Sequence, residues 1–280
     1  MSTILVVANE TLAGRKLLET VKERAAAGGE GTRVVVCVPR NKPKHGNIIY
    51  DDFVFDAAKV RIDLARRFLR DEGIVAIGDI GDPDPYTATM DAVAEHHPDE
   101  IIVSTYPATV SGWLRRDLIE RIEQASNLPV THCEQDIDAE GIPFHVTLVV
   151  AAKTASGDEL LRCVKAKAGD DPRGNLFIVI VPQEGGEGQH AARARARMAQ
   201  VVDRMIAENL IAAGMIGDPD PYTATMNALQ FFRVDDIVIS TLPATRSGWL
   251  RADLIERVRK TTNKDVEHVE AGERTAANAA

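Results

Sequence analysis

Continuous runs of apolar residues alternate along the chain with segments in which apolar residues recur at helical spacing. In the first half, the continuous runs predict buried strands at 3–8, 33–38, 74–80, 100–105 and 129–134. The segments between them predict helices at 14–27, 57–73, 85–97 and 113–126. This alternation favours right-handed crossovers and a doubly wound parallel α/β sheet, in which ligands bind at the carboxyl ends of the strands.

The pattern occurs twice because the chain is an internal repeat. "IGDPDPYTATM" at 80–90 recurs unchanged at 216–226. The segment 104–122 matches 240–258 at 15 of 19 positions, with the same offset of 136. A repeat of this length indicates a tandem pair of domains and not a solenoid.

Upstream of these blocks the copies match more loosely. Residues 4–39 agree with 147–182 at 15 of 36 positions with an offset of 143, which places about seven extra residues of the first copy in 41–53. A polar segment with Gly141 and Pro143 separates the copies. We therefore expect two five-stranded domains, at 1–138 and 143–272.

Composition excludes several classes of protein. Hydrophobic residues make up 45% and charged residues 27% of the 280, which is typical of a globular protein. The net charge of −9 argues against a nucleic-acid-binding surface. The chain has no apolar run near 18 residues and no leader pattern, so we expect no membrane contact and a cytoplasmic location. Three unpaired cysteines without C-x-x-C spacing favour a reduced protein without a zinc site, and we expect no metal.

The first repeated block carries two aspartates in "GDPDPY", Asp82 and Asp84, which recur as Asp218 and Asp220. Asp84 before Pro85 suits a helix N-cap, and Asp-Pro favours a turn. Ser, Thr or Asn would cap as well, so identity in both copies also favours contact with a ligand hydroxyl or an ion. Both interpretations stay open.

The second repeated block places hydroxyls at a strand end and before a helix. Free amides at a helix start attract anions, and hydroxyls and arginine strengthen such a site. The alternative is a simple helix cap with a surface charge. The candidate ligand-binding residues of this block are Ser104, Thr105, Ser111, Gly112 and Arg115 in the first copy and Ser240, Thr241, Ser247, Gly248 and Arg251 in the second.

These units resemble universal stress protein domains. The resemblance lies in "ILVVAN", the "GDP" turn, "EIIVST" and "LPV", and it covers nearly all of both units. It implies a five-stranded α/β sheet, dimer formation and, in many members, ATP binding. Where the nucleotide-binding members carry an aspartate after the first strand, this chain has Asn9 and Ala152, and of the family's glycine pattern only Gly112 and Gly248 remain. Any phosphate site must then use hydroxyls.

Three functions compete. The leading hypothesis is a regulatory protein, and not an enzyme, that binds an adenine nucleotide or another small anion without turnover. The alternatives are a ligand-free scaffold and a nucleotide hydrolase. His132 and His268 recur on the last strand of each copy, where a satisfied strand histidine is favoured over catalysis. We expect the two copies to form a pair within the chain, with homodimer formation a further option, and to differ as binding sites because Asn9 corresponds to Ala152 and Arg116 to Ala252.

Overall fold

The computed structural model describes residues 2–41, 51–113, 117–155, 157–183, 189–243, 247–251 and 253–272, with the backbone alone for 189, 250 and 251. The described chain forms two compact units, and the chain passes from the first to the second between Pro143 and Phe144. The extra residues expected at 41–53 lie mostly outside the described part. Residues 51–53 belong to a helix.

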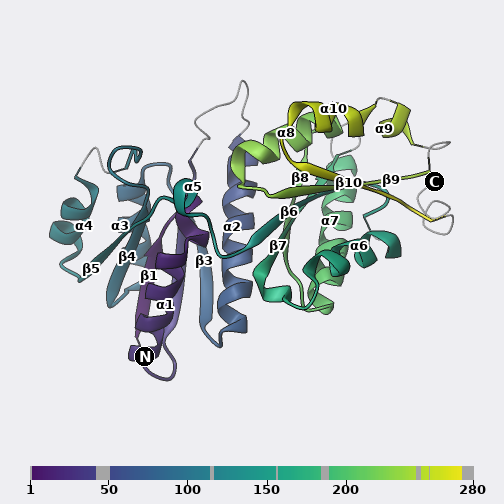
Figure 1. Cartoon of the computed structure of the whole chain (residues 1–280). Coiled ribbons are helices and arrows are strands. Elements are labelled where there is room, and N and C mark those ends of the chain that lie inside the picture. The colour runs from purple at the N-terminus through teal and green to yellow at the C-terminus, as the bar shows by residue number, and fades with distance from the viewer. Residues whose placement is uncertain are drawn as a thin grey trace. The chain divides into compact units, whose positions relative to one another are not determined.

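Unit 1 contains one parallel sheet flanked by helices (Figure 1). Its strands are β1 (Thr3–Val7), β2 (Arg33–Pro39), β3 (Val75–Gly81), β4 (Glu100–Thr105) and β5 (Val130–Glu134). Its helices are η1 (Glu10–Ala13, a 3₁₀ turn), α1 (Arg15–Ala27), α2 (Asp51–Asp71), α3 (Pro85–His96), α4 (Leu118–Ser126) and α5 (Ile137–Glu140).

The strand order in unit 1 is β3-β2-β1-β4-β5, and all pairings are parallel. Both faces of the central strand are buried. Ile4 and Val6 pack in one core with Leu17 of α1 and Ala58 of α2, whereas Leu5 packs in the other with residues of α3 and α4. Burial on both faces explains why β1 is a continuous apolar run and not an alternating one.

Unit 2 repeats this architecture. Its strands are β6 (His145–Ala151), β7 (Asn175–Pro182), β8 (Ile211–Gly217), β9 (Asp236–Thr241) and β10 (Asp265–Glu270), in the parallel order β10-β9-β6-β7-β8. Its helices are α6 (Asp158–Ala168), η3 (Pro172–Gly174), α7 (Gln189–Ala207), α8 (Pro221–Phe231), α9 (Gly248–Arg251) and α10 (Leu254–Thr261). The expected fold class, two five-stranded doubly wound sheets, is confirmed.

One predicted helix start was wrong and bears on the function. The helix expected at 113–126 begins at Leu118, because Asp117 before it has a left-handed backbone with φ of 50°. Asp253 has the same conformation before α10, with φ of 49°. In unit 1, Ser111 and Gly112 lie on the far side of residues 114–116, which are outside the described part. In unit 2, the equivalent Ser247 directly precedes the short helix α9 (Gly248–Arg251).

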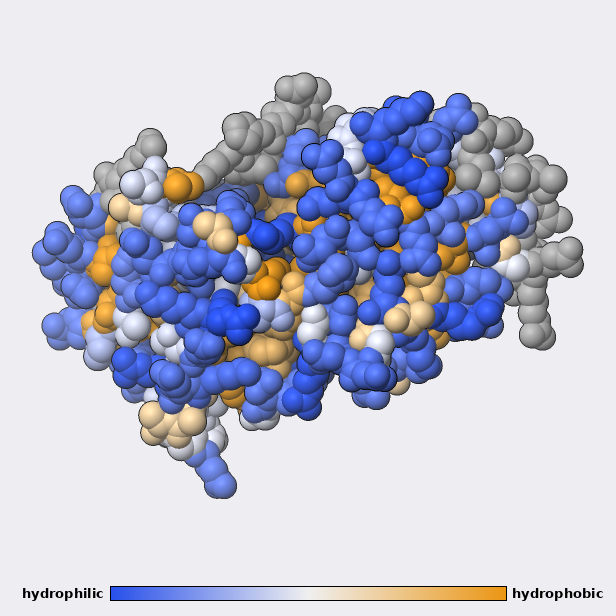
Figure 2. Space-filling model, in the orientation of Figure 1, coloured by the Kyte–Doolittle hydropathy of each residue, from blue (hydrophilic) through white to orange (hydrophobic). Residues whose placement is uncertain are grey.

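The described surface is mostly hydrophilic on the face drawn in Figure 2, with apolar residues in scattered patches. Among the described helices, we find none with the length and apolar character that crossing a membrane requires.

Candidate functional site

In a doubly wound sheet, the crevice for a ligand opens where the strand order reverses. In unit 1 this point lies between the carboxyl ends of β1 and β4, and in unit 2 between those of β6 and β9. Both repeated blocks leave the sheet at this edge, the first after β3 or β8 and the second after β4 or β9.

In both units, close packing accounts for the glycine that opens the first block. A Cβ added to Gly81 would lie 2.5 Å from Ala88 Cβ, and one added to Gly217 would lie 2.7 Å from Ala224 Cβ. The strand end and the helix that follows it approach so closely that only glycine fits. Gly81 and Ala88 are therefore retained together for packing.

The aspartates of the first block hold the turn and cap the helix in both units. Asp84 accepts hydrogen bonds from the Thr87 amide and the Thr87 hydroxyl, both at 3.0 Å. The equivalent Asp220 accepts from Thr223 N at 2.9 Å and from its hydroxyl at 2.8 Å. Asp82 and Asp218 each accept from the amide of the next aspartate, at 2.8 and 2.9 Å. The capping interpretation is thus sufficient for all four aspartates.

The tyrosine and the second threonine of the block are also engaged. The guanidinium of Arg121 lies 4.0 Å from the Tyr86 ring centroid, and that of Arg257 lies 4.1 Å from Tyr222. Thr89 is fully buried and donates to the Pro85 carbonyl at 2.6 Å. These contacts fix the first turns of the helix against its neighbour.

In the second block, a threonine and a histidine form the same pair in both units. Thr105 Oγ1 lies 2.8 Å from His132 Nε2 and donates to the Tyr106 carbonyl at 2.8 Å, and Thr241 repeats this with His268. Because the hydroxyl has one proton, which goes to the carbonyl, His132 Nε2 is the donor. Burial lowers the pKa of both His132 and His268.

Polar side chains fill the switch point of unit 1. Asn9 is buried and its Nδ2 donates to the Pro39 carbonyl at 2.6 Å. Gln135, also buried, donates to the Thr11 carbonyl at 2.9 Å and to Ser104 Oγ at 2.8 Å. Asn9 Oδ1 is buried with no hydrogen-bond partner among the described residues. The hydroxyl of Ser104 is consequently engaged by the protein itself.

Unit 2 has a cavity of about 370 Å³ at the equivalent point. Ala152 and Ala271 stand where unit 1 has Asn9 and Gln135. The cavity is lined by Ala152, Lys153, Thr154, Pro182, Gln183, Pro219, Ser240, Thr241, Leu242, Ser247, Gly248 and Trp249. Four of these residues carry hydroxyls and Lys153 carries an exposed ammonium group.

The cavity of unit 1 lies elsewhere at the same sheet edge and measures about 670 Å³. It is lined by segments after β2 and β3, by Gly112 and Trp113, and by Arg121 of α4. With its amide in the orientation that satisfies both neighbours, Asn41 donates to the Pro83 carbonyl at 3.2 Å and accepts from Trp113 Nε1 at 2.8 Å. The two repeated blocks thus meet through Asn41 at the wall of this cavity.

The candidate residues are therefore distributed unequally. In unit 1, Asp84 and Gly112 line the cavity, whereas Asn9, Ser104, Thr105 and Ser111 are buried. In unit 2, Ser240, Thr241 and Ser247 are buried to the same degree but line the cavity together with Gly248, and Pro219 lies between Asp218 and Asp220. Arg115 and the side chain of Arg251 lie outside the described residues.

The two units differ in the side chains at the switch point. In unit 1 this strand end is filled by Asn9 and Gln135, and Glu10 adds a negative charge. In unit 2 the equivalent positions hold Ala152, Ala271 and Lys153. At this point unit 2 therefore carries a positive charge where unit 1 carries a negative one.

Sequence reasoning missed Lys153, Gln135 and Ala271 because its candidates came from identities between the copies, and it missed Thr154 because it took candidates only from the two highly retained blocks. The differences carried the signal, since aligning the copies pairs Glu10 with Lys153 and Gln135 with Ala271. Trp113 and Trp249 also line the two cavities.

No family model matches the chain, and no curated protein matches it. Three solved structures are similar over nearly all of their length and of this chain. A universal stress protein from Archaeoglobus fulgidus DSM 4304 is 18% identical over 97% of both chains, with a TM-score of 0.37. A protein from Pseudomonas aeruginosa UCBPP-PA14, described as a universal stress protein, is 16% identical over 100% of this chain and 96% of its own, with a TM-score of 0.33.

A protein of unknown function from Pseudomonas aeruginosa PAO1 is 16% identical over the same shares, with a TM-score of 0.32. Two of these three structures carry the name of the family that the sequence resembles. At these identities and TM-scores the likeness adds nothing about ligand or activity, so the functional argument depends on the cavities themselves.

Proposed function

We propose that this protein is a regulatory binding protein of the stress-protein type that holds a small anion in the cavity of unit 2, with an adenine nucleotide as the favoured ligand. The observation that carries the proposal is the cavity at the switch point between β6 and β9, with its hydroxyl lining and Lys153. Its volume of about 370 Å³ is within the range of about 300–1,000 Å³ that is typical of small-molecule sites.

Charge supports an anionic ligand in unit 2. Lys153 follows β6 directly after Ala152, and the equivalent residue after β1 is Glu10. Thr154, Ser240, Thr241 and Ser247 place hydroxyl groups at the same cavity. The ammonium group of Lys153 is a donor that forms charge-assisted hydrogen bonds to phosphate or carboxylate. The Thr154 and Thr241 hydroxyls already donate to the Ser240 and Leu242 carbonyls, so Lys153 carries the argument for an anion.

Binding without turnover is favoured by the chemistry of the lining. Among the described residues that line the cavity of unit 2, none is a carboxylate, a histidine or a cysteine. Hydrolysis of a phosphate ester needs a group that positions or deprotonates water, and the lining supplies only hydroxyls and one cation for binding.

Titration calorimetry of the full chain with AMP, ADP and ATP tests the proposal. Lys153→Ala should weaken the affinity at least tenfold, since one charge-assisted contact contributes about 1.5–3 kcal/mol. Glu10→Ala is the matched control because it removes a charge at the equivalent position of unit 1, and it should leave the affinity unchanged.

A second variant tests the site by filling it. Ala271→Gln introduces the side chain that occupies the switch point of unit 1, and it should also reduce binding at least tenfold. If the wild type binds none of the three nucleotides and releases no small molecule on denaturation, the ligand-free scaffold function replaces this proposal. Equal losses in Lys153→Ala and Glu10→Ala would show that the ligand does not lie in unit 2.

A further inference from the structure

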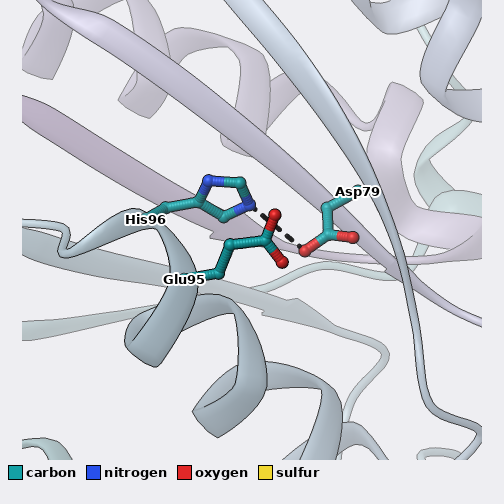
Figure 3. Close-up of side chains that lie close together, drawn as sticks. All are labelled: Asp79, Glu95 and His96. Atoms are coloured by element: carbon teal, nitrogen blue, oxygen red, sulfur yellow. Dashed lines mark hydrogen bonds and ion pairs between the residues drawn. The ribbon is translucent and has the colours of Figure 1, made fainter.

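Three side chains with metal-binding groups converge in unit 1, away from both cavities (Figure 3). Asp79 lies on β3, the outermost strand of the sheet, and Glu95 and His96 lie at the end of α3. Their nearest ligand atoms all lie within 4.8 Å of one another, and His96 Nε2 is 3.3 Å from Asp79 Oδ2. In Figure 3 both carboxylates lie beside the imidazole ring.

The spacing suits a zinc ion. Ligand atoms about 2.0–2.2 Å from a tetrahedral Zn²⁺ are roughly 3.4 Å from one another. The His96–Asp79 contact of 3.3 Å already has that spacing. The Glu95 carboxylate is on an exposed side chain, so a small rotation can bring it to the same distance. One imidazole nitrogen and two carboxylate oxygens would leave the fourth position to water, as in open zinc sites.

Unit 2 shows what these positions hold when no polar group is needed. With the offset of 136, Asp79, Glu95 and His96 correspond to Met215, Phe231 and Phe232. All three are buried, with exposures of 4%, 6% and 8%. In that unit the end of the helix and the edge of the sheet therefore hold buried apolar side chains at these positions. Unit 1 replaces all three apolar side chains with groups that ligate metals.

A simple ion pair does not account for the whole cluster. Asp79 and His96 suffice for one, and Glu95 then places a second negative charge beside Asp79. Like charges at this distance repel, whereas a divalent cation between them removes the repulsion. A hard ion such as Mg²⁺ prefers oxygen ligands alone, and the imidazole instead favours zinc and its transition-metal neighbours.

We propose that Asp79, Glu95 and His96 form a zinc-binding site that joins the end of α3 to strand β3. The site belongs to unit 1 and is independent of the ligand proposed for unit 2. It would stabilise this edge of the sheet in place of the apolar packing found in unit 2.

The test is titration of the chelator-treated full chain with ZnCl₂, followed by thermal unfolding with and without the metal. His96→Gln and Asp79→Asn should each weaken binding at least tenfold. Because zinc binds the folded unit, it should raise the unfolding temperature of the wild type but not of His96→Gln. His97→Asn is the matched control, since His97 is the exposed neighbour of His96 and asparagine tolerates its left-handed backbone, with φ of 46°.

A third variant keeps the test valid if a single substitution disturbs the fold. The combined change Asp79→Met, Glu95→Phe and His96→Phe copies unit 2, where these residues pack, and it should fold without binding zinc at this site. Zinc that binds elsewhere on the chain would still bind to this variant, and that amount is subtracted from the zinc bound by the wild type. Equal zinc affinity in His96→Gln and His97→Asn, equal binding in the wild type and the combined variant, or displacement of zinc by equimolar Mg²⁺ would overturn the proposal.

Discussion

The two units share the architecture of the carboxyl edge of the sheet and differ at the switch point, as the pairing of Asn9 with Ala152 predicted. Both place their repeated blocks at the carboxyl edge of the sheet, with the same caps and the same threonine–histidine pair. Yet Gln135 and Asn9 fill the switch point of unit 1, and alanines leave a cavity in unit 2. Retained residues therefore maintain the fold, and the residues that differ decide which unit has room for a ligand.

This comparison changes how the identical block at 80–90 is interpreted. Gly81, Asp82, Asp84, Tyr86 and Thr89 each have a packing or hydrogen-bonding role, and the equivalent residues repeat all five in unit 2. Because these side chains contact one another or the backbone of the same turn, few single substitutions are tolerated there. Packing and hydrogen bonding are enough to explain why the same residues occur in both units, whatever either unit binds.

The largest loss of stability is expected for the glycine that opens the first repeated block in each unit. Gly81→Ala and Gly217→Ala should each destabilise the protein by about 1–3 kcal/mol, because the new methyl group overlaps the following helix. Gly112→Ala and Gly248→Ala are the matched controls, since an added Cβ there meets no atom within 4 Å. These two changes should stay within about 0.5 kcal/mol of the wild type.

Urea unfolding of the four glycine variants measures the difference. Equal destabilisation by all four would show that the second block is as tightly packed as the first. A loss in Gly81→Ala without one in Gly217→Ala would break the structural equivalence of the units.

The strands were predictable because both faces of each sheet are covered. The expected strand 100–105 coincides with β4 (Glu100–Thr105), since a strand buried on both faces is a continuous apolar run. The start of α4 was not predictable in this way. Helical spacing continues through Asp117, and its left-handed backbone leaves no mark on the apolar pattern.

Whether the switch point is filled or open was even harder to predict from the sequence. Asn9 and Pro39 are 30 positions apart, and Gln135 and Thr11 are 124 apart. Only the tertiary structure shows that these side chains fill one crevice. The hydroxyls of the second block could be chosen from their position after a strand, but the sequence does not tell whether the protein itself engages them.

A smaller loss of stability is expected when the aspartates that cap α3 and α8 are changed. Asp84→Ala and Asp220→Ala should each cost about 0.5–2 kcal/mol, and Asp84→Asn and Asp220→Asn much less, because asparagine caps equally well. Thermal unfolding measures the stability of all four variants. Asp220→Asn should also leave nucleotide affinity unchanged, as Pro219 and not Asp220 lines the cavity of unit 2. A tenfold loss of affinity in this variant with normal stability would assign the carboxylate to the ligand.

The smallest effect is a pH dependence common to both units. Burial lowers the pKa of His132 and His268 below the value of about 6.5 in an unfolded chain. As the pH falls through 6.5 the unfolded chain takes up protons first, so stability is full above that pH and declines until the folded histidines titrate. The combined change His132→Gln and His268→Gln should flatten the fall of the unfolding temperature between about pH 7.5 and 5. An unchanged slope would contradict the assignment.

Ligand binding should then separate the two histidines. Both partner threonines are buried, but Thr241, the partner of His268, lines the cavity of unit 2, whereas Thr105, the partner of His132, does not line the cavity of unit 1. A bound anion favours the charged form of a nearby histidine. AMP should therefore raise the pKa of His268 and leave that of His132 unchanged, as followed by the ring proton resonances in an NMR titration. If the two pKa values move together, the nucleotide does not distinguish the units. The cavity of unit 2 would then not be its site.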